Sequence, residues 1–262
     1  MDHGQSTAAT PDTNGTTAAG TDDDFTAGSF GATYRTGRWL VDQRVEYRTS
    51  DNSEKWGLAG GVHVEPGRDL GLLASVRLLR TDYRQAGHHN LSDVSVGLAW
   101  RPAANPWTLL QRLSYRTEDK TGSPLALSNW RVVNNLNVQR MLGARDQIST
   151  LIGVRYNRDT IDGRQYSGFT DQLGLEWRHF IGSRWDLGLR GATRHGWQSG
   201  VVDYSAGVSG GYKVLEDIWL SLGYNFTGYS DRDFSAADYT AQGPYLRFRV
   251  RLNQETTHEM LR

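Results

Sequence analysis

The feature that most constrains the fold is an alternation of apolar and polar residues that recurs between residues 38 and 252. In the closing stretch, GPYLRFRVRL at 243–252, apolar side chains alternate with Arg247, Arg249 and Arg251. Because successive side chains of a β-strand point to opposite faces, each such stretch predicts a strand with one apolar and one polar face. Helical spacing is not sustained anywhere in the chain, so the sequence predicts an all-β fold.

The orientation of these faces follows from what could cover them. About twelve stretches alternate in this way, each close to the 9–11 residues that a tilted strand needs to cross a bilayer. No amphipathic helices are available to cover so many apolar faces, and the hydrophobic content of 37% is low for a water-soluble core. We therefore predict a closed transmembrane antiparallel up-and-down β-barrel of about 12 strands, with apolar side chains against lipid and polar side chains inside.

Aromatic residues stand at the ends of the apolar faces. Most of these faces begin or end on Trp or Tyr, as the aromatic belts at the two interfaces of a membrane barrel do. A soluble sandwich has no reason to place aromatic residues at both ends of its strands. The sequence predicts an aromatic girdle formed by Trp39, Tyr47, Trp56, Trp100, Trp107, Tyr115, Trp130, Tyr156, Trp177 and Trp185.

The polar faces are basic although the formal net charge of the chain is zero. We predict a positive lumen, which favours either an anionic solute or an acidic segment of the chain itself, such as Asp22, Asp23 and Asp24. The alternative is that networks of arginine and glutamate fill the bore and hold the strands in register. The predicted lumen-lining basic residues are Arg44, Arg48, Arg77, Arg112, Arg116, Arg131, Arg155, Arg178, Arg190, Arg194, Lys213, Arg247, Arg249 and Arg251.

Composition excludes several other classes of protein. The 29 basic and 29 acidic residues balance, so the charge does not predict a nucleic-acid partner. The absence of cysteine excludes disulfides and thiolate chemistry. No run of 18 apolar residues predicts a transmembrane helix, and the first residues lack the basic and apolar regions of a signal peptide. We predict no cofactor.

The chain divides into four parts. Residues 1–24 contain no large apolar residue and are expected to be a disordered tail or linker. Residues 25–36 form an additional strand, a plug or a segment that threads the lumen. Residues 37–252 form the barrel, and 253–262 form a polar periplasmic tail. Longer connectors expected at 82–92, 117–126, 158–167 and 230–241 alternate with short ones, which predicts that the longer set is extracellular.

Residues 38–252 as a whole resemble a Gram-negative outer-membrane β-barrel. The closing region, LGYNFTGYSDRDFSAADYTAQGPYLRFRVRL, resembles the C-terminal barrel found behind long repeat regions in large bacterial surface proteins. This resemblance implies a bacterial outer-membrane protein that anchors, or acts as a translocation conduit for, an N-terminal surface-exposed region. It also implies two partners, the lipid bilayer and the barrel-assembly machinery, with Phe248 and Leu252 at the alternating positions that an assembly signal uses.

The sequence offers weak candidates for chemistry. His88 and His89, expected in an outer loop between Asp82 and Asp93, suggest a hydrolytic or metal site, but adjacent loop histidines rarely form one alone. The acidic residues of DRDFSAAD lack the full spacing of a calcium loop. We therefore predict no catalytic and no metal-binding residue. Three functions remain open: a surface anchor or translocation conduit, an anion-preferring diffusion pore, and an outer-membrane hydrolase.

Overall fold

One antiparallel sheet accounts for the regular structure of this protein. The computed structural model describes residues 2–6, 23–85, 87–103, 105–122, 126–215, 218–231, 233–234 and 242–250. These residues form a 14-stranded sheet in which the strands follow one another in sequence order. No helix among them could cross a membrane. The strands are β1 (Asp2–Ser6), β2 (Asp23–Thr36), β3 (Trp39–Ser50), β4 (Ser53–Gly67), β5 (Leu70–Tyr83), β6 (Gly87–Trp100), β7 (Trp107–Lys120), β8 (Leu127–Leu142), β9 (Asp146–Ile161), β10 (Arg164–Ile181), β11 (Trp185–Gly196), β12 (Val201–Leu215), β13 (Ile218–Thr227) and β14 (Gly243–Val250).

The strands begin earlier in the chain than the barrel predicted from the sequence. Strands β3 to β14 fill the span in which about twelve strands are expected. Residues 25–36 lie in β2, which pairs with β3 from Phe25 opposite Ser50 to Thr36 opposite Trp39. The short strand β1 lies within the segment 1–24, for which the sequence predicts no order. Its backbone pairs with β2 from Asp2 opposite Ala27 to Ser6 opposite Asp23, and backbone pairing does not require apolar residues.

Burial in this sheet is the reverse of burial in a water-soluble protein. In β13, Ser221 and Asn225 are buried, whereas Leu222 is 64% exposed and Phe226 is 56% exposed. The buried apolar residues of the described chain are few: Val133, Tyr229 and Phe234. The buried polar ones are Ser50, Thr81, Ser95, Thr170, Gln172, Arg178, Asp186, Ser205, Ser221, Asn225 and Asp231. The polar side is therefore the interior and the apolar side the exterior, as the sequence predicts for a membrane barrel.

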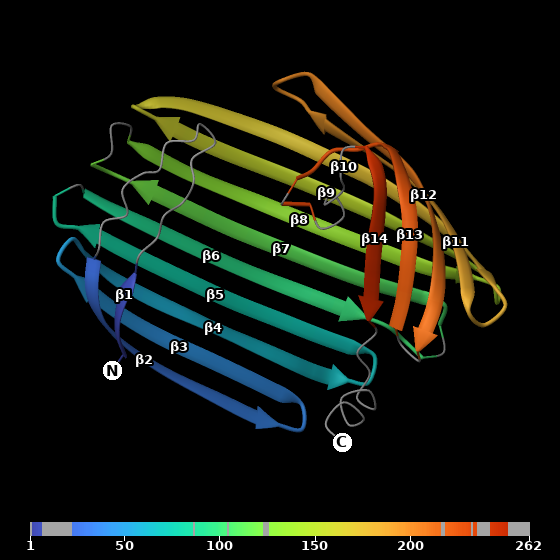
Figure 1. Cartoon of the computed structure of the whole chain (residues 1–262), viewed down its shortest axis with the longest axis horizontal. Helices are drawn as coiled ribbons and strands as arrows, with labels where there is room; N and C mark the ends of the chain where they lie inside the picture. Colours follow the sequence, from blue (N-terminus) through green and yellow to red (C-terminus); the bar gives the residue numbers. More distant parts are fainter. Residues whose placement is uncertain are drawn as a thin grey trace.

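The sheet is curled, and its last strands turn across the middle ones (Figure 1). Residues of β4, β7, β10 and β14 consequently line one cavity on the polar side. Strands β1 and β14 are the two edges, and they do not pair with each other, in contrast to the closed cylinder predicted from the sequence. Unpaired backbone N–H and C=O groups are not stable in hydrocarbon. Because β14 runs antiparallel to β1, the strand directions are those that closure of β14 on β1 would require.

The strand ends form two rims. We call the rim with the β2–β3, β4–β5, β6–β7, β8–β9, β10–β11 and β12–β13 connections the short rim, and the opposite one the long rim. At the long rim, two connectors predicted to be long, 82–92 and 158–167, are mostly strand, whereas 117–126 contains only the end of β7. Pairing in β5 and β6 continues to Tyr83 opposite Gly87, and in β9 and β10 to Ile161 opposite Arg164. At these positions the alternation of apolar and polar residues has ended, although the strands continue. Beyond the bilayer both faces of a hairpin are in water, so its backbone pairing needs no apolar face.

Candidate functional site

The interior face brings distant basic residues together around one acidic segment. Arg131 of β8, Arg155 of β9 and Arg194 of β11 converge on Asp231 and Asp233, which follow β13. We call residues 228–231 and 233–234 the inserted segment. It enters the polar side of the sheet from the β13–β14 connection of the long rim, where the sequence predicts a long connector at 230–241.

The ion pairs of the inserted segment form a continuous network. Nη1 of Arg155 lies 2.9 Å from Oδ1 of Asp231 and 2.8 Å from Oδ2 of Asp233. Nη1 of Arg131 lies 3.0 Å from Asp233, and Nη1 of Arg194 lies 2.7 Å from Asp231. The side chains of Asp231 and Asp233 are only 6% and 13% exposed. Charges this enclosed depend on their partners, since an unpaired buried charge is strongly destabilising.

Aromatic contacts fix the same segment. Phe234 is 1% exposed and covers Gly153 of β9, where an added Cβ would lie 2.5 Å from the Phe234 ring. The guanidinium of Arg155 lies 5.4 Å from the centre of that ring, and the guanidinium of Arg194 lies 4.9 Å from the centre of the Tyr229 ring. Ion pairs, cation–π contacts and the packing of Phe234 on Gly153 therefore hold the inserted segment in a defined binding position on the interior face.

We expect Gly153→Ala to displace the inserted segment without changing any charge. The new methyl group would occupy space now filled by Phe234, so the ring and the segment must move away from β9. Ionic current through the purified protein in planar bilayers should rise. Gly210→Ala is the matched control, because nothing lies within 4 Å of its added Cβ. Equal currents from both variants would contradict the binding position of the inserted segment, in which Phe234 packs on Gly153.

A second interior cluster joins β10 to β14. Arg178 is hydrogen-bonded to Asp186 and lies 2.6 Å from Oε1 of Glu176. Arg190 is hydrogen-bonded to Asn225, and its guanidinium lies 4.5 Å from the centre of the Tyr245 ring. Contacts of this kind agree with the alternative to an open bore, in which arginine networks fill the bore and hold the strands in register.

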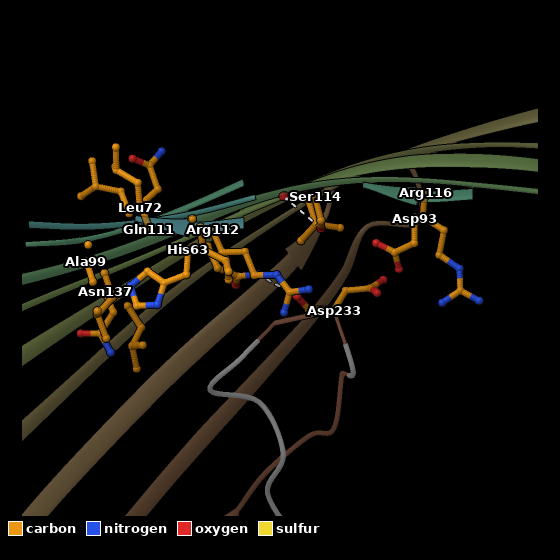
Figure 2. Close-up of a pocket in the computed structure, with 18 of the residues that line it drawn as sticks. His63, Leu72, Asp93, Ala99, Gln111, Arg112, Ser114, Arg116, Asn137 and Asp233 are labelled. Atoms are coloured by element: carbon orange, nitrogen blue, oxygen red, sulfur yellow. Dashed lines mark hydrogen bonds between the residues drawn. The ribbon is translucent and has the colours of Figure 1, made fainter. Parts of the chain in front are cut away.

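The remaining predicted basic residues are less enclosed. Arg112 and Arg77 make no ion pair with a described residue, and Arg112 lies in a cavity of about 1480 Å³ together with the interior residues Arg116, Asn135 and Arg247. Figure 2 shows Asp233 on the side of the sheet that carries His63, Arg112 and Asn137. The other contacts are Arg44 with Glu46 at 3.7 Å, Arg48 over Phe25, Arg116 with Glu118 at 3.8 Å, Arg247 over Tyr245 and Lys213 over Trp219. The side chain of Arg249 and all of Arg251 lie outside the described residues.

The ten residues of the predicted aromatic girdle fall into two rows. Ring contacts connect the row nearer the long rim, with ring centres of Tyr47 and Trp56 5.3 Å apart and those of Trp130 and Tyr156 5.4 Å apart. In the row nearer the short rim, Nε1 of Trp177 donates a hydrogen bond to Oδ1 of Asp146 at 3.1 Å. The first row consists of Tyr47, Trp56, Tyr115, Trp130 and Tyr156, and the second of Trp39, Trp100, Trp107, Trp177 and Trp185.

The spacing of the two rows fits a membrane. Trp39 and Tyr47 of β3 are eight positions apart, and so are Trp107 and Tyr115 of β7. Eight residues of strand span about 27 Å, which at a tilt of about 40° gives a height of about 21 Å. The apolar band of outer-membrane barrels is about 25 Å tall. We infer that the two rows are the two interfacial belts.

The strands extend farther beyond the aromatic row at the long rim. There β9 continues from Tyr156 to Ile161, whereas at the short rim β7 and β11 begin on Trp107 and Trp185 themselves. The inserted segment also enters from the long rim. Because outer-membrane barrels have short periplasmic turns and longer extracellular hairpins, we assign the long rim to the cell exterior.

The candidate catalytic histidines do not form a site. His88 and His89 lie in β6 and not in a loop, so their side chains point to opposite faces. Nε2 of His88 lies 3.1 Å from Asp119, and Nε2 of His89 lies 3.0 Å from Glu118. No group of three potential metal ligands occurs among the described residues.

Comparison with known proteins identifies the fold. No protein-family model matches the chain, and no curated protein matches it in sequence. The siderophore receptor PirA from Pseudomonas aeruginosa superposes with a TM-score of 0.58 at 11% identity, over 88% of this chain and 50% of the receptor. The ferric enterobactin receptor PfeA from Pseudomonas aeruginosa gives a TM-score of 0.56 at 10% identity, over 78% of this chain and 41% of the receptor. The alcaligin outer-membrane receptor FauA from Bordetella pertussis gives a TM-score of 0.54 at 14% identity, over 78% of this chain and 41% of the receptor.

This chain has the fold of a bacterial outer-membrane β-barrel. The predicted fold class and the predicted location in the outer membrane are confirmed. Because this fold places the apolar face outward, that face is surrounded by the lipid bilayer. The chain spans about half the length of the PirA structure and 41% of the PfeA and FauA structures. The resemblance of the closing region to barrels of repeat-bearing surface proteins stays a prediction.

Proposed function

We propose that this barrel anchors in the outer membrane a surface-exposed region that lies N-terminal to β2. The observation that supports this most is the direction of β2. Its first residue, Asp23, lies at the long rim, because Phe25 pairs with Ser50 just before the β3–β4 turn. The chain before β2 thus meets the barrel at the rim that we assign to the cell exterior.

The inserted segment supports an anchor over an open translocation conduit. It brings Asp231 and Asp233 onto three interior arginines and places Phe234 against the barrel wall. A barrel that only anchors can fill its bore in this way, whereas a conduit must clear it. The resemblance of residues 222–252 to barrels behind surface repeats agrees with this function, and assembly by the barrel-assembly machinery stays a prediction.

Labelling of intact cells tests the proposal. An epitope tag inserted immediately before Asp23 should bind antibody on intact bacteria. The same tag inserted between Pro102 and Ala103, in the β6–β7 connection of the short rim, should bind only after the outer membrane is permeabilised. The reverse pattern would place the N-terminal region in the periplasm and end the anchor proposal.

An anion-preferring diffusion pore is the second candidate. It is favoured by the interior cavity of about 1480 Å³ and by Arg112, which lines it without an ion-pair partner among the described residues. A steady anion-selective current through the unmodified protein would support the pore. No contact among the described residues favours the third candidate, a hydrolase.

A further inference from the structure

Two amide side chains lie on the apolar, exterior face of the sheet at mid-height. Gln111 of β7 is four positions from Trp107 and four from Tyr115, so it lies midway between the two aromatic rows. Asn134 of β8 is likewise four positions from Trp130. Nε2 of Gln111 donates to Oδ1 of Asn134 at 3.1 Å, and this bond is exposed on the surface of the barrel.

The surroundings of this amide pair are apolar. The residues directly opposite Gln111 on the neighbouring strands are Leu98 and Leu136. Asn134 stands opposite Leu113 and Val154 in the same way. Figure 2 shows Gln111 and Leu72 projecting from the side of the sheet opposite to His63 and Arg112. The side chains next to the pair are thus apolar, although the same exterior face carries Gln43 on β3 and the Asp171–His195 pair on β10 and β11.

Lipid chains cannot satisfy the hydrogen-bonding groups that remain. A carboxamide offers two N–H donors and one oxygen acceptor, and the single bond between the pair uses one donor and one acceptor. Neither amide makes another hydrogen bond to a described residue. At this depth no water replaces the missing partners, so leaving three N–H groups and the Oε1 of Gln111 unpaired is unfavourable. A protein surface that brings donors and acceptors would remove this penalty.

We propose that the exterior face of β7 and β8 is the contact surface with a second copy of this chain. The pair is self-complementary about a two-fold axis: Oε1 of Gln111 can accept from Nδ2 of Asn134 of the partner subunit, and the reverse bond forms by symmetry. The surrounding leucine and valine side chains can pack against their counterparts. Amide side chains hold transmembrane segments together in the same way in helical membrane proteins.

Cross-linking in liposomes tests this contact. The chain has no cysteine, so Leu113→Cys introduces a single reactive thiol beside the amide pair. Purified Leu113→Cys protein in phosphatidylcholine liposomes, treated with a short bis-maleimide, should form a covalent dimer. Leu189→Cys, at a similar height on β11, should not.

Removal of the amides separates their role from general hydrophobic contact. In the Leu113→Cys background, Gln111→Leu with Asn134→Leu should reduce the yield of dimer about tenfold, as expected for the loss of two symmetric amide bonds. Both leucines suit lipid, so the monomer should still fold and keep the heat-dependent shift in gel mobility of a folded barrel. Gln43→Leu is the matched control, because Gln43 is also an exterior amide midway between the two rows but lies on β3.

Three results would overturn the proposal. The first is no dimer from Leu113→Cys in liposomes, the second is a dimer that survives removal of both amides, and the third is a dimer that Gln43→Leu also abolishes. The proposal depends on the membrane placement of the barrel and not on the anchor function. Failure of the dimer would leave the surface-labelling result of the N-terminal tag unchanged.

Discussion

Replacing Leu189 by arginine should lower the free energy of unfolding in lipid vesicles by about 2–4 kcal/mol. Leu189 lies on the exterior face of β11, is 50% exposed, and stands four positions from Trp185 of the row nearer the short rim. The substitution therefore places a cation at mid-height in hydrocarbon. Urea titration of the protein in vesicles, followed by tryptophan fluorescence, measures the change.

A second arginine on the same face shows whether depth is the cause. Thr193 lies on β11 eight positions from Trp185, at the level of the outer aromatic row. Thr193→Arg should cost about 0–1 kcal/mol, because a cation is tolerated near the interface. If the two variants were equally destabilised, the exterior face of β11 would not cross a bilayer between these positions.

Removal of both acidic groups of the inserted segment should open the bore. Asp231→Asn with Asp233→Asn leaves Arg131 and Arg155 without the carboxylates that lie within 3.0 Å of them, and leaves Arg194 paired with Asp203 alone. Loss of one partner from a buried ion pair costs about 3–5 kcal/mol, enough to release a short segment that is otherwise held by aromatic contacts and by the hydrogen bond from Asn135 to the backbone oxygen of Asp233. We expect a several-fold increase in single-channel conductance and a preference for anions, measured in planar bilayers under a salt gradient.

The control for this variant removes a carboxylate elsewhere. Asp82→Asn breaks the ion pair with Arg80, in which both side chains are largely exposed at the long rim. Exposed pairs of this kind contribute little, so conductance should remain that of the unmodified protein. An unchanged conductance in the double variant would mean that the inserted segment does not limit the bore.

The strands and their faces can be predicted from the sequence because lipid imposes a period of two on each of them. Leu222 and Phe226 of β13 face outward for this reason, with Ser221 and Asn225 inside. The extent of the strands beyond the bilayer cannot be predicted in this way. His88 is part of β6 through backbone pairing with Asp82, and neither residue carries an apolar signal.

The binding position of the inserted segment also cannot be predicted from the alternation of apolar and polar residues. Asp233 meets Arg131 from 102 positions away, and Phe234 fits over Gly153, contacts that no local spacing specifies. The sequence does indicate an acidic partner for a basic lumen, but the acidic segment predicted from it is Asp22, Asp23 and Asp24, of which the last two lie in β2. The signal that could have decided for Asp231 and Asp233 is their position between Tyr229 and Phe234 in a long connector, since aromatic rings help such a segment to remain inside.

Lipid exposure along a single strand tests the inverted barrel most directly. Because the chain has no cysteine, spin labels can be attached one at a time to single cysteines at positions 185–194 of β11 in liposomes. Accessibility to oxygen, which partitions into lipid, should alternate with a period of two and reach its maxima at 185, 187, 189, 191 and 193. Maxima at the even-numbered positions, or no alternation, would show that the apolar side chains do not face the bilayer.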